Sequence, residues 1–427
     1  MKHISFSMIK QFAKNEYIFS ISSRIITILV AFFQSILVAR YLGSTLQGDM
    51  ASVTSISSIG AIFITFGLHQ AYPYLWKTYG KDSIYNQYLS IIVLYFTVWM
   101  ILGLILAVRF FYSLNYSGAI ILIPIQGYAN VVGYICLVEN PNKRNKLWTI
   151  TAFAEVFLVI LLYLLTESNW FYAFFIYSFV EVVRGIVFTI MLKPYIEFNM
   201  KLILLFKKLL LMGFFPMLAL LMTTLNYKID ILMLQIFDNI TSSDIGVYSV
   251  GISIVDKIAI VPDTLMGVLV SKLAKGKDEY EVAKVCRISL WFNIIIGLAL
   301  VILGPNIITF LYGDAYREAY SIIIICAAGT IFIGYFKLIA QYNIVNKKQA
   351  RNVILLSVSN ITNIILNILL IPHYSLQGAA LASGCGYFIS GMIFVLWFSR
   401  NNKISLGVMF IPQKSDFNFI KDKLNMI

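Results

Sequence analysis

Ionisable residues lie inside long apolar stretches of this sequence, where a charge is costly. Five of them are basic: Arg24, Arg184, Lys228, Lys257 and Lys337. A charge at the centre of a bilayer costs at least ~2.5–3.5 kcal/mol on insertion scales, so such residues normally face a protein interior or a wet cavity. Ammonium and guanidinium groups could neutralise an anionic ligand there, and a guanidinium suits a pair of phosphate oxygens. We therefore predict an anion-binding site within a membrane.

Each basic residue also has a purely structural interpretation. Arg24 shares a helical face with polar residues at spacings of three, four and seven, which points it inward. It lies close enough to the start of its apolar segment to extend to the membrane surface instead. Lys228 is either a substrate cation or the partner of a nearby acid. Arg184 follows Glu181 by three residues, which is the spacing of an ion pair within one helix.

Four acidic residues in these segments are candidates for binding a proton or Na⁺. They are Glu181, Asp230, Asp256 and Asp263. Asp230 shares a face with Asn226 and Tyr227, whereas Lys228 is two residues from Asp230 and cannot share that face of a regular helix. Asp256 and Asp263 are seven residues apart and share a face, and Pro262 beside Asp263 would free backbone carbonyls to help bind a cation.

Neutral polar residues extend the predicted binding site. Lys337 and Gln341 are one helical turn apart, and Asn360, Asn363 and Asn367 form an amide face on a later segment. These amides could donate hydrogen bonds to sugar hydroxyls. Hydrogen bonding between neighbouring membrane helices explains them equally well.

The elements that must position these residues are membrane-spanning helices. The sequence is 59% hydrophobic and only 12% charged, against roughly 45–50% and 25% in soluble domains. Its apolar residues occur in blocks of about 20, the length of a helix that crosses the hydrocarbon core. The dyad alternation of membrane β-strands is absent. We therefore predict an all-α integral membrane protein.

Twelve spans account for the hydropathy pattern. They are 18–39, 50–74, 86–108, 118–138, 147–165, 170–192, 211–237, 245–270, 288–311, 320–344, 352–371 and 377–399. With this division, 25 of the 33 Lys and Arg residues fall on one side of the membrane, and three, Arg40, Arg109 and Arg317, fall on the other. Because basic residues collect in cytoplasmic loops, both termini are expected in the cytoplasm. This asymmetry, rather than nucleic-acid binding, explains the net charge of +13.

Two halves of six spans each are expected, and each half carries a similar turn. The halves are an N-terminal lobe, 1–192, and a C-terminal lobe, 211–399, followed by a cytoplasmic tail, 400–427. An amphipathic cytoplasmic linker, 193–210, connects them. The turn "VARYLGSTLQGDM" follows the first span, and "LQIFDNITSSDIGVYSV" follows the seventh. Turns of this kind need Gly and small polar residues anyway, but their matching positions favour a duplication.

Catalytic motifs are absent from the sequence. It contains no GxxxxGK[ST], HExxH or strand-linked GxGxxG pattern, so an ATP-driven pump or a metalloenzyme is not expected. The four cysteines show neither CxxC spacing nor a disulfide framework. The histidines, His3, His69 and His373, are far apart at helix ends and are expected at the membrane interface. We therefore predict no enzyme, no metal site and no cofactor, with H⁺ or Na⁺ as the counter-ion if transport is ion-driven.

Three motifs resemble one family of transporters. They are the "ARYLG" turn, the "DIGVYSV" turn and "IPHYSLQGAALAS" between the last two spans. The whole chain resembles the polysaccharide-transport flippases (Wzx type) of the multidrug/oligosaccharidyl-lipid/polysaccharide exporter superfamily. The sequence departs from the usual pattern of this family at Asp49-Met50 and at Ser375-Leu376. Both pairs lie in turns, so they do not weaken the resemblance.

The resemblance implies a V-shaped bundle of two lobes that moves lipid-diphosphate-linked oligosaccharides, such as O-antigen units of lipopolysaccharide, across the bacterial inner membrane. The substrate headgroup would cross by alternating access through a cationic central cavity, surrounded by membrane lipids and served by polysaccharide polymerase machinery. A multidrug antiporter of the same superfamily is the alternative, although a cavity for cationic drugs would favour carboxylates over lysines. A membrane polymerase or ligase is disfavoured because the outward loops are short.

Overall fold

The computed structural model describes residues 16–109, 114–195, 201–274, 279–346, 348–413 and 416. These described residues are 91% helical and include no strand. They form two compact units, 1–221 and 222–427. The predicted all-α fold is confirmed.

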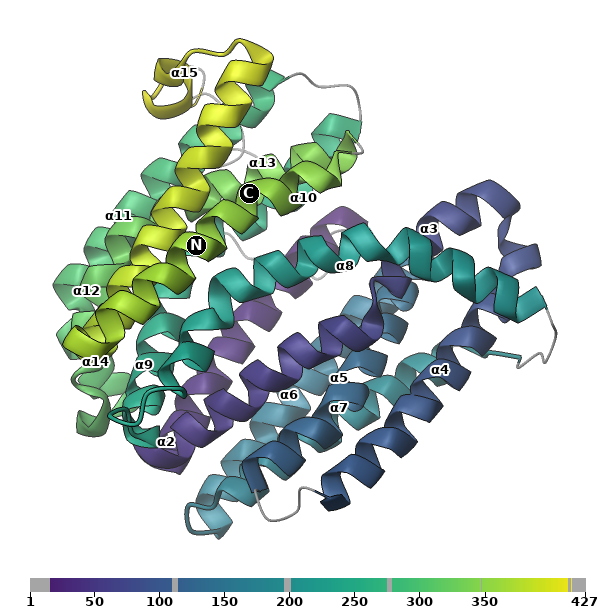
Figure 1. Cartoon of the computed structure of the whole chain (residues 1–427), viewed down its shortest axis with the longest axis horizontal. Helices are drawn as coiled ribbons and strands as arrows, with labels where there is room; N and C mark the ends of the chain where they lie inside the picture. The colour runs from purple at the N-terminus through teal and green to yellow at the C-terminus, as the bar shows by residue number, and fades with distance from the viewer. Residues whose placement is uncertain are drawn as a thin grey trace, which may run out of the picture. The chain divides into compact units, whose positions relative to one another are not determined.

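Unit 1 begins with a helix that reverses its direction. The helix α2, Glu16–Thr65, consists of two arms that meet at Gly43, where φ is +68°. Only glycine adopts that backbone conformation readily. The first arm runs along α6 (Pro141–Leu165), from the Ser23–Thr149 contact of 2.7 Å to the Tyr41–Thr166 contact of 2.9 Å. Figure 1 shows both arms of α2 meeting at one end.

The second arm of α2 runs along α5 (Leu114–Glu139), which is antiparallel to α6. Ser57 donates a hydrogen bond to the Ala119 carbonyl (3.3 Å), and the Ile64 side chain lies against Gly127. The remaining helices of unit 1 are α3, Leu68–Tyr79; α4, Lys81–Arg109; and α7, Trp170–Leu192. The reversal at Gly43 is the predicted turn between the first two spans.

The helix α8, Lys201–Leu234, continues through Pro216 without a break. It therefore joins the second part of the predicted linker, 193–210, to the predicted seventh span as one helix, and residues 196–200 lie outside the described residues. The change from unit 1 to unit 2 falls within α8, after Leu221.

Unit 2 contains the other long reversal. Its helix α14, Gln349–Asn402, has two arms that meet at Ser375, where φ is +48°. The arms are antiparallel, because Gly378 lies against the Leu370 carbonyl and Gly386 lies against Asn363.

Apart from the long helix α11, the other elements of unit 2 are short. They are α9, Ser242–Val255; η1, Asp256–Ala259; α10, Ile260–Ala274; α11, Glu279–Tyr312; η2, Asp314–Tyr316; α12, Ala319–Thr330; α13, Ile333–Val345; and α15, Leu406–Phe410. The predicted eighth span is therefore interrupted at η1, where Asp256 lies. The predicted tenth span is a pair, α12 and α13, bent by 45°.

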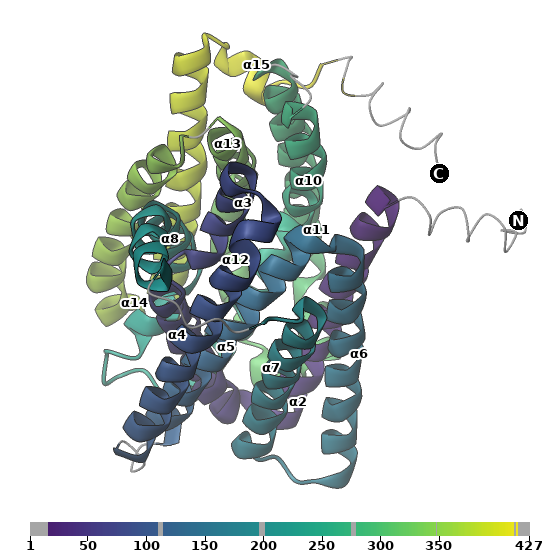
Figure 2. The ribbon, with the colours of Figure 1, turned by 90° about the vertical axis from the view of Figure 1, so that its right-hand side faces the viewer.

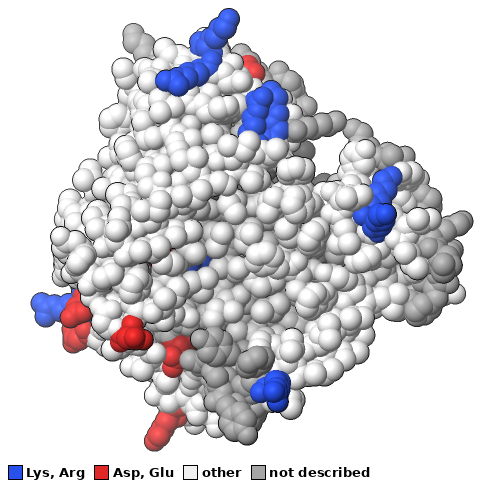
Figure 3. All heavy atoms as spheres, viewed as in Figure 1, with Lys and Arg blue, Asp and Glu red and all other residues white. Residues whose placement is uncertain are grey.

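Nine helices in the described residues are long and apolar enough to cross a membrane, and the α12–α13 pair makes ten. Two of the nine, Ile26–Trp76 and Gln349–Asn402, contain the reversals at Gly43 and Ser375 and therefore supply two crossings each. The described ranges thus hold twelve crossings, in agreement with the hydropathy pattern. Figure 3 shows a broad uncharged surface with most of the charged side chains near its margins, as expected for helices surrounded by lipid.

Small residues allow the helices of unit 2 to pack closely. A Cβ placed on Gly329 of α12 would lie 1.8 Å from the Gly384 carbonyl oxygen of α14. The two backbones therefore touch, as membrane helices do where small residues line the interface.

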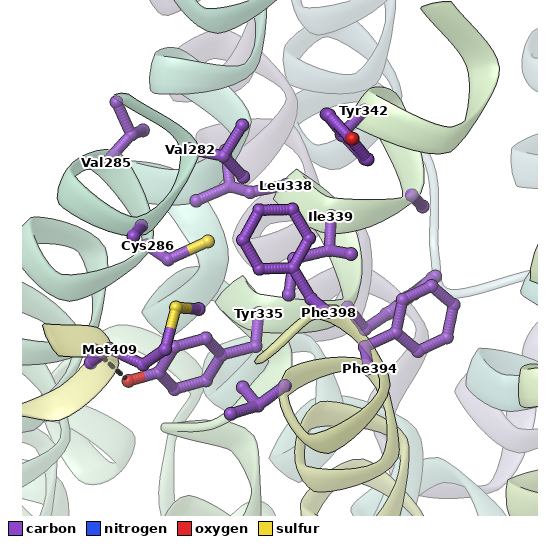
Figure 4. Packing of buried hydrophobic residues seen from close by; sticks show 14 of the residues in the cluster. Val282, Val285, Cys286, Tyr335, Leu338, Ile339, Tyr342, Phe394, Phe398 and Met409 are labelled. Atoms are coloured by element: carbon purple, nitrogen blue, oxygen red, sulfur yellow. Dashed lines mark hydrogen bonds between the residues drawn. The ribbon is translucent and has the colours of Figure 1, made fainter. Parts of the chain in front are cut away.

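The short helix α15 closes one end of unit 2, beyond α14 (Figures 1 and 2). Its Met409 is fully buried in the apolar cluster shown in Figure 4, and the Tyr335 hydroxyl donates a hydrogen bond to the Met409 carbonyl (2.9 Å). Arg287 of α11 is 2% exposed and donates two hydrogen bonds of 2.6 Å to the Asp416 carboxylate. It also donates to the Val408 carbonyl. These contacts hold the segment after α14 against α11 and α13.

Asp416→Asn should lower the thermal stability of the protein. Removing one partner of a buried ion pair costs about 3–5 kcal/mol because the other charge stays buried. Burial raises the pKa of Asp416, but hydrogen bonds from Arg287 and the Gln413 N–H outweigh burial and hold that pKa below its ordinary value. The pair should therefore stabilise fully above pH ~4, the ordinary range of Asp, and its contribution should be lost as the pH falls through the lowered pKa.

The measurement is thermal unfolding in detergent, followed by tryptophan fluorescence from about pH 2 to pH 8, so that the scan includes the range in which Asp416 becomes protonated. Asp314→Asn, an exposed acid in a turn, is the matched control. Equal unfolding temperatures for Asp416→Asn and the wild type would show that the pair contributes nothing.

Candidate functional site

Unit 2 brings five of the predicted site residues into one group, which we call the lysine–aspartate cluster. Its members are Lys228 of α8, Asp256 and Lys257 of η1, Asp263 of α10 and Lys337 of α13. Lys337 Nζ donates to both carboxylate oxygens of Asp263, at 2.8 and 2.9 Å. The same ammonium lies 5.4 Å from the centre of the Tyr227 ring, which attracts a cation.

Asp256 connects the rest of the cluster. It interacts electrostatically with Lys228, Lys257 and Lys337, and its buried Oδ1 atom accepts no hydrogen bond. With all groups ionised, three lysines face two aspartates. In that state the cluster has one excess positive charge among apolar helices, where an anion would be attracted strongly.

The Asp263–Lys337 pair should show measurable coupling. Asp263→Asn leaves Lys337 without the carboxylate that it contacts, and Lys337→Gln leaves Asp263 without its ammonium, whereas the double variant removes both charges of the pair. Pairs in direct contact typically couple by about 0.5–3 kcal/mol. Thermal unfolding of both single variants and the double variant should therefore show the double variant to be more stable than the sum of the single effects predicts. Purely additive losses would mean that the two side chains do not interact in solution.

A second group of predicted residues surrounds Asp230, and we call it the Asp230 cluster. Asp230 is 1% exposed and accepts hydrogen bonds from Asn363 (3.0 Å) and Asn367 (2.8 Å) of α14. Ser383, on the other arm of α14, donates to its second oxygen and also contacts the Tyr248 hydroxyl at 2.9 Å. Within the described part of the chain, Asp230 forms no ion pair. Its negative charge is balanced by amide and hydroxyl dipoles.

This arrangement can hold a small cation. Asp230 supplies a full negative charge, and the Asn367 Oδ1 atom is buried without a hydrogen-bond partner. Since the amide groups of Asn can turn to present either oxygen or nitrogen, Asn363 and Asn367 can present oxygens to Na⁺ or nitrogens to the bare carboxylate. Protonation of Asp230 would equally remove the buried charge.

Two other asparagine side chains form hydrogen bonds between helices. Asn360 donates to the Met222 carbonyl (2.9 Å), and Asn226 donates to Ser359 (3.3 Å). Gln341 is half-buried on α13, one turn beyond Lys337. Of the two interpretations of the asparagine face, the structure therefore favours hydrogen bonding between helices.

In unit 1, Arg184 lies between two carboxylates. It donates to Glu181 Oε1 (2.5 Å), to Glu155 Oε2 (3.1 Å) and, through Nε, to the Thr151 hydroxyl (3.0 Å). Arg184, Glu155 and Glu181 are only 7%, 3% and 6% exposed, and Gln34 donates to Glu155 (2.6 Å). We call these three charged residues the Glu–Arg–Glu group. The donors of Arg184 are thus engaged within the protein rather than directed to a ligand.

Sequence reasoning missed Glu155. The available signal was a single acid in the middle of the apolar stretch 152–165. His69 lies at a helix end, as predicted, since it is the second residue of α3. Its side chain is 8% exposed and packs edge-on against Tyr134 at 5.0 Å. The side chain of Arg24 and residue His3 lie outside the described part of the chain.

Solved structures of membrane transporters share this architecture. The structure of the lipid II flippase MurJ in an inward closed conformation matches with a TM-score of 0.70 and 18% identity, over 92% of this chain and 91% of that one. An inward-facing multidrug resistance MATE family transporter of the MOP superfamily matches with a TM-score of 0.61 and 13% identity, over 88% and 94%. At these identities the matches show the fold, which is that of MOP superfamily transporters.

The sequence identifies the family more closely. The family model for polysaccharide biosynthesis proteins matches residues 13–262, so the chain belongs to that family. The capsular polysaccharide biosynthesis protein CapF of Staphylococcus aureus is 30% identical over 133 residues, which are 30% of this chain and 34% of CapF. The matched part therefore covers about a third of the length of that curated relative. Membership of this family confirms the resemblance to polysaccharide-transport proteins that the motifs indicated.

Proposed function

We propose that this protein is a flippase that moves a polyprenyl-diphosphate-linked oligosaccharide, the repeat unit of a surface polysaccharide such as O-antigen, from the cytoplasmic to the periplasmic leaflet. It works by alternating access, with both termini in the cytoplasm and the lipid chain remaining in the inner-membrane bilayer. It forms no covalent bond with the substrate.

The observation that carries the proposal is the excess positive charge of the lysine–aspartate cluster. An anionic headgroup that leaves water for an apolar helix bundle loses its hydration, so it needs compensating charge within the protein. The cluster supplies it from three lysines. Membership of the polysaccharide biosynthesis family supports a saccharide attached to that anion, and the fold shared with a lipid II flippase supports a lipid carrier.

Ion coupling at Asp230 completes the proposal. A buried carboxylate without a basic partner is stabilised by binding H⁺ or Na⁺. Its ligands come from α8 and from both arms of α14, so cation binding would favour one arrangement of these helices over another. Glu181, Asp256 and Asp263 were also predicted as coupling residues, but two of them have basic partners in direct contact.

The test uses purified protein in liposomes that contain a fluorescent polyprenyl-diphosphate oligosaccharide. A membrane-impermeant quencher reports the fraction of label in the outer leaflet. Liposomes with the protein should exchange the label between leaflets faster than protein-free liposomes, and a Na⁺ or H⁺ gradient should bias the distribution.

Two outcomes would overturn the proposal. Export of a cationic dye without movement of the labelled lipid would instead support a multidrug antiporter, which is the alternative that the MATE-like fold allows. Elongation of the oligosaccharide by the protein alone would indicate a polymerase.

A further inference from the structure

We propose that a polar pocket of unit 1, which none of the predicted site residues lines, binds the phosphate-bearing end of the substrate headgroup. This inference rests on the proposed function. The pocket has a volume of about 300 Å³, and the second arm of α2, α3, α5, α6 and α8 line it. Its polar lining includes Ser58, Thr65, His69, Asn130, Tyr134 and Arg144.

The guanidinium of Arg144 is held in place by its surroundings. It lies 4.2 Å from the centre of the Trp148 ring and donates from one terminal nitrogen to Asn145 Oδ1 at 3.2 Å. Arg184 of the Glu–Arg–Glu group also lies over the Trp148 ring, at 4.8 Å. The planar fork of an arginine suits two phosphate oxygens, and a fixed fork loses little conformational freedom on binding.

His69 gives a second, independent sign of a ligand. Its side chain is 92% buried and lines the pocket, yet its Nδ1 atom has no hydrogen-bond partner. Buried polar atoms are nearly always paired, so an unpaired one in a pocket indicates a missing partner. Nδ1 can donate to a phosphate oxygen or, in the other tautomer, accept from a hydroxyl.

The rest of the lining suits the group attached to the phosphate. Ser58 and Thr65 carry hydroxyls, Asn130 is exposed, and Tyr134 and Trp148 supply aromatic surface. The volume is at the lower end of the ~300–1,000 Å³ of ligand pockets. It suits a phosphate with part of one sugar, rather than a whole oligosaccharide.

Arg144 lies in the first turn of α6, four residues after the N-cap residue Asn140. The positive end of the helix dipole therefore adds to the charge of the guanidinium. Within unit 1, this places a fixed cation and an unpaired imidazole in one concave site. The phosphate ester is the substrate group that both would recognise.

The experiment measures binding of geranyl diphosphate, a short isoprenoid diphosphate, to the purified protein in detergent. Arg144→Gln should weaken binding at least ~10-fold, as loss of a charge-assisted, bidentate contact does. Asn130→Asp should weaken it as well by placing a negative charge in the pocket, and because Asn130 is exposed, this change leaves the packing intact. Arg109→Gln, an exposed arginine elsewhere in unit 1, is the matched control and should bind like the wild type.

Inorganic pyrophosphate and uridine diphosphate N-acetylglucosamine distinguish the possible sources of the phosphate. The proposal expects geranyl diphosphate to bind more tightly than either, because its isoprenoid chain can contact the apolar part of the lining, Ala61, Ile62 and Leu220. Equal or tighter binding of the soluble compounds would overturn assignment of the pocket to the lipid-linked headgroup. Unchanged affinity in both Arg144→Gln and Asn130→Asp would overturn the site itself.

Because the assay needs no transport, its outcome is separable from that of the proposed function. Binding that depends on Arg144, in a protein that moves no labelled lipid, would leave the pocket assigned and refute only the flippase.

Discussion

Asp230→Asn should abolish the response of transport to an ion gradient while leaving a folded protein. The substitution keeps the size and shape of the side chain but removes the only formal charge in the Asp230 cluster. Asn363, Asn367 and Ser383 all donate to Asp230. The variant keeps one acceptor oxygen for these donors but loses the negative charge that would attract a cation. We expect cation affinity to fall by ~10–100-fold or more, the range found when groups around a bound ion are changed.

The measurement is the rate of leaflet exchange of the labelled lipid with and without Na⁺ and H⁺ gradients. Asp238→Asn, in the exposed turn after α8, is the matched control and should respond to both gradients like the wild type. If Asp230→Asn kept the wild-type rate and the wild-type ion dependence, Asp230 would not be the coupling residue.

Loss of activity alone would not be enough to establish this role. Asp230 also ties α8 to α14, so its removal could destabilise unit 2. Ser383→Ala serves as a second variant, because it removes one donor to Asp230 and keeps the charge. It should retain ion dependence with a shifted half-maximal concentration, whereas purely structural damage would change the rate at all ion concentrations together.

The helices were predictable from the sequence because the physical constraint is simple. A span needs about 20 apolar residues, and the turns at Gly43 and Ser375 lie between such blocks. The interruption at η1 and the bend between α12 and α13 were not predictable, since mean hydropathy stays high across both stretches despite their few charged residues, and hydropathy does not register a change of direction.

Contacts between residues that are far apart in the sequence were harder to predict. The amide face of Asn363 and Asn367 was evident from their spacing, but its partner, Asp230, is more than 130 residues away. Lys337 and Asp263 are likewise 74 residues apart. Which charge meets which depends on how the helices pack, and one sequence does not contain that information.

The pocket around His69 and Arg144 was missed for a different reason. Both residues are near predicted span ends, where a polar side chain is ordinarily at the membrane surface. The chain bends at Phe66 and Gly67, which both have positive φ, and α3 then turns His69 into the bundle. A local backbone feature of two residues thus changes the environment of a side chain that hydropathy assigns to the interface.

Arg184→Met should prevent accumulation of folded protein. The change removes the guanidinium that contacts both Glu155 and Glu181. The two carboxylates, which are only 3% and 6% exposed, then repel each other. Removing one partner of a buried ion pair costs about 3–5 kcal/mol, a large fraction of the ~5–15 kcal/mol that stabilises a typical soluble domain. We expect little monodisperse protein on size-exclusion chromatography after extraction.

A triple variant decides between the two roles that the sequence left open for Arg184. Glu155→Gln and Glu181→Gln combined with Arg184→Met remove all three charges at nearly constant volume, and such neutral replacements are often tolerated where single ones are not. If Arg184 serves only to balance the two glutamates, the triple variant should recover both its yield and its lipid exchange. Recovery of yield without exchange would instead show that the Glu–Arg–Glu group acts in transport, because the folded helices would be present and only the charges would be missing.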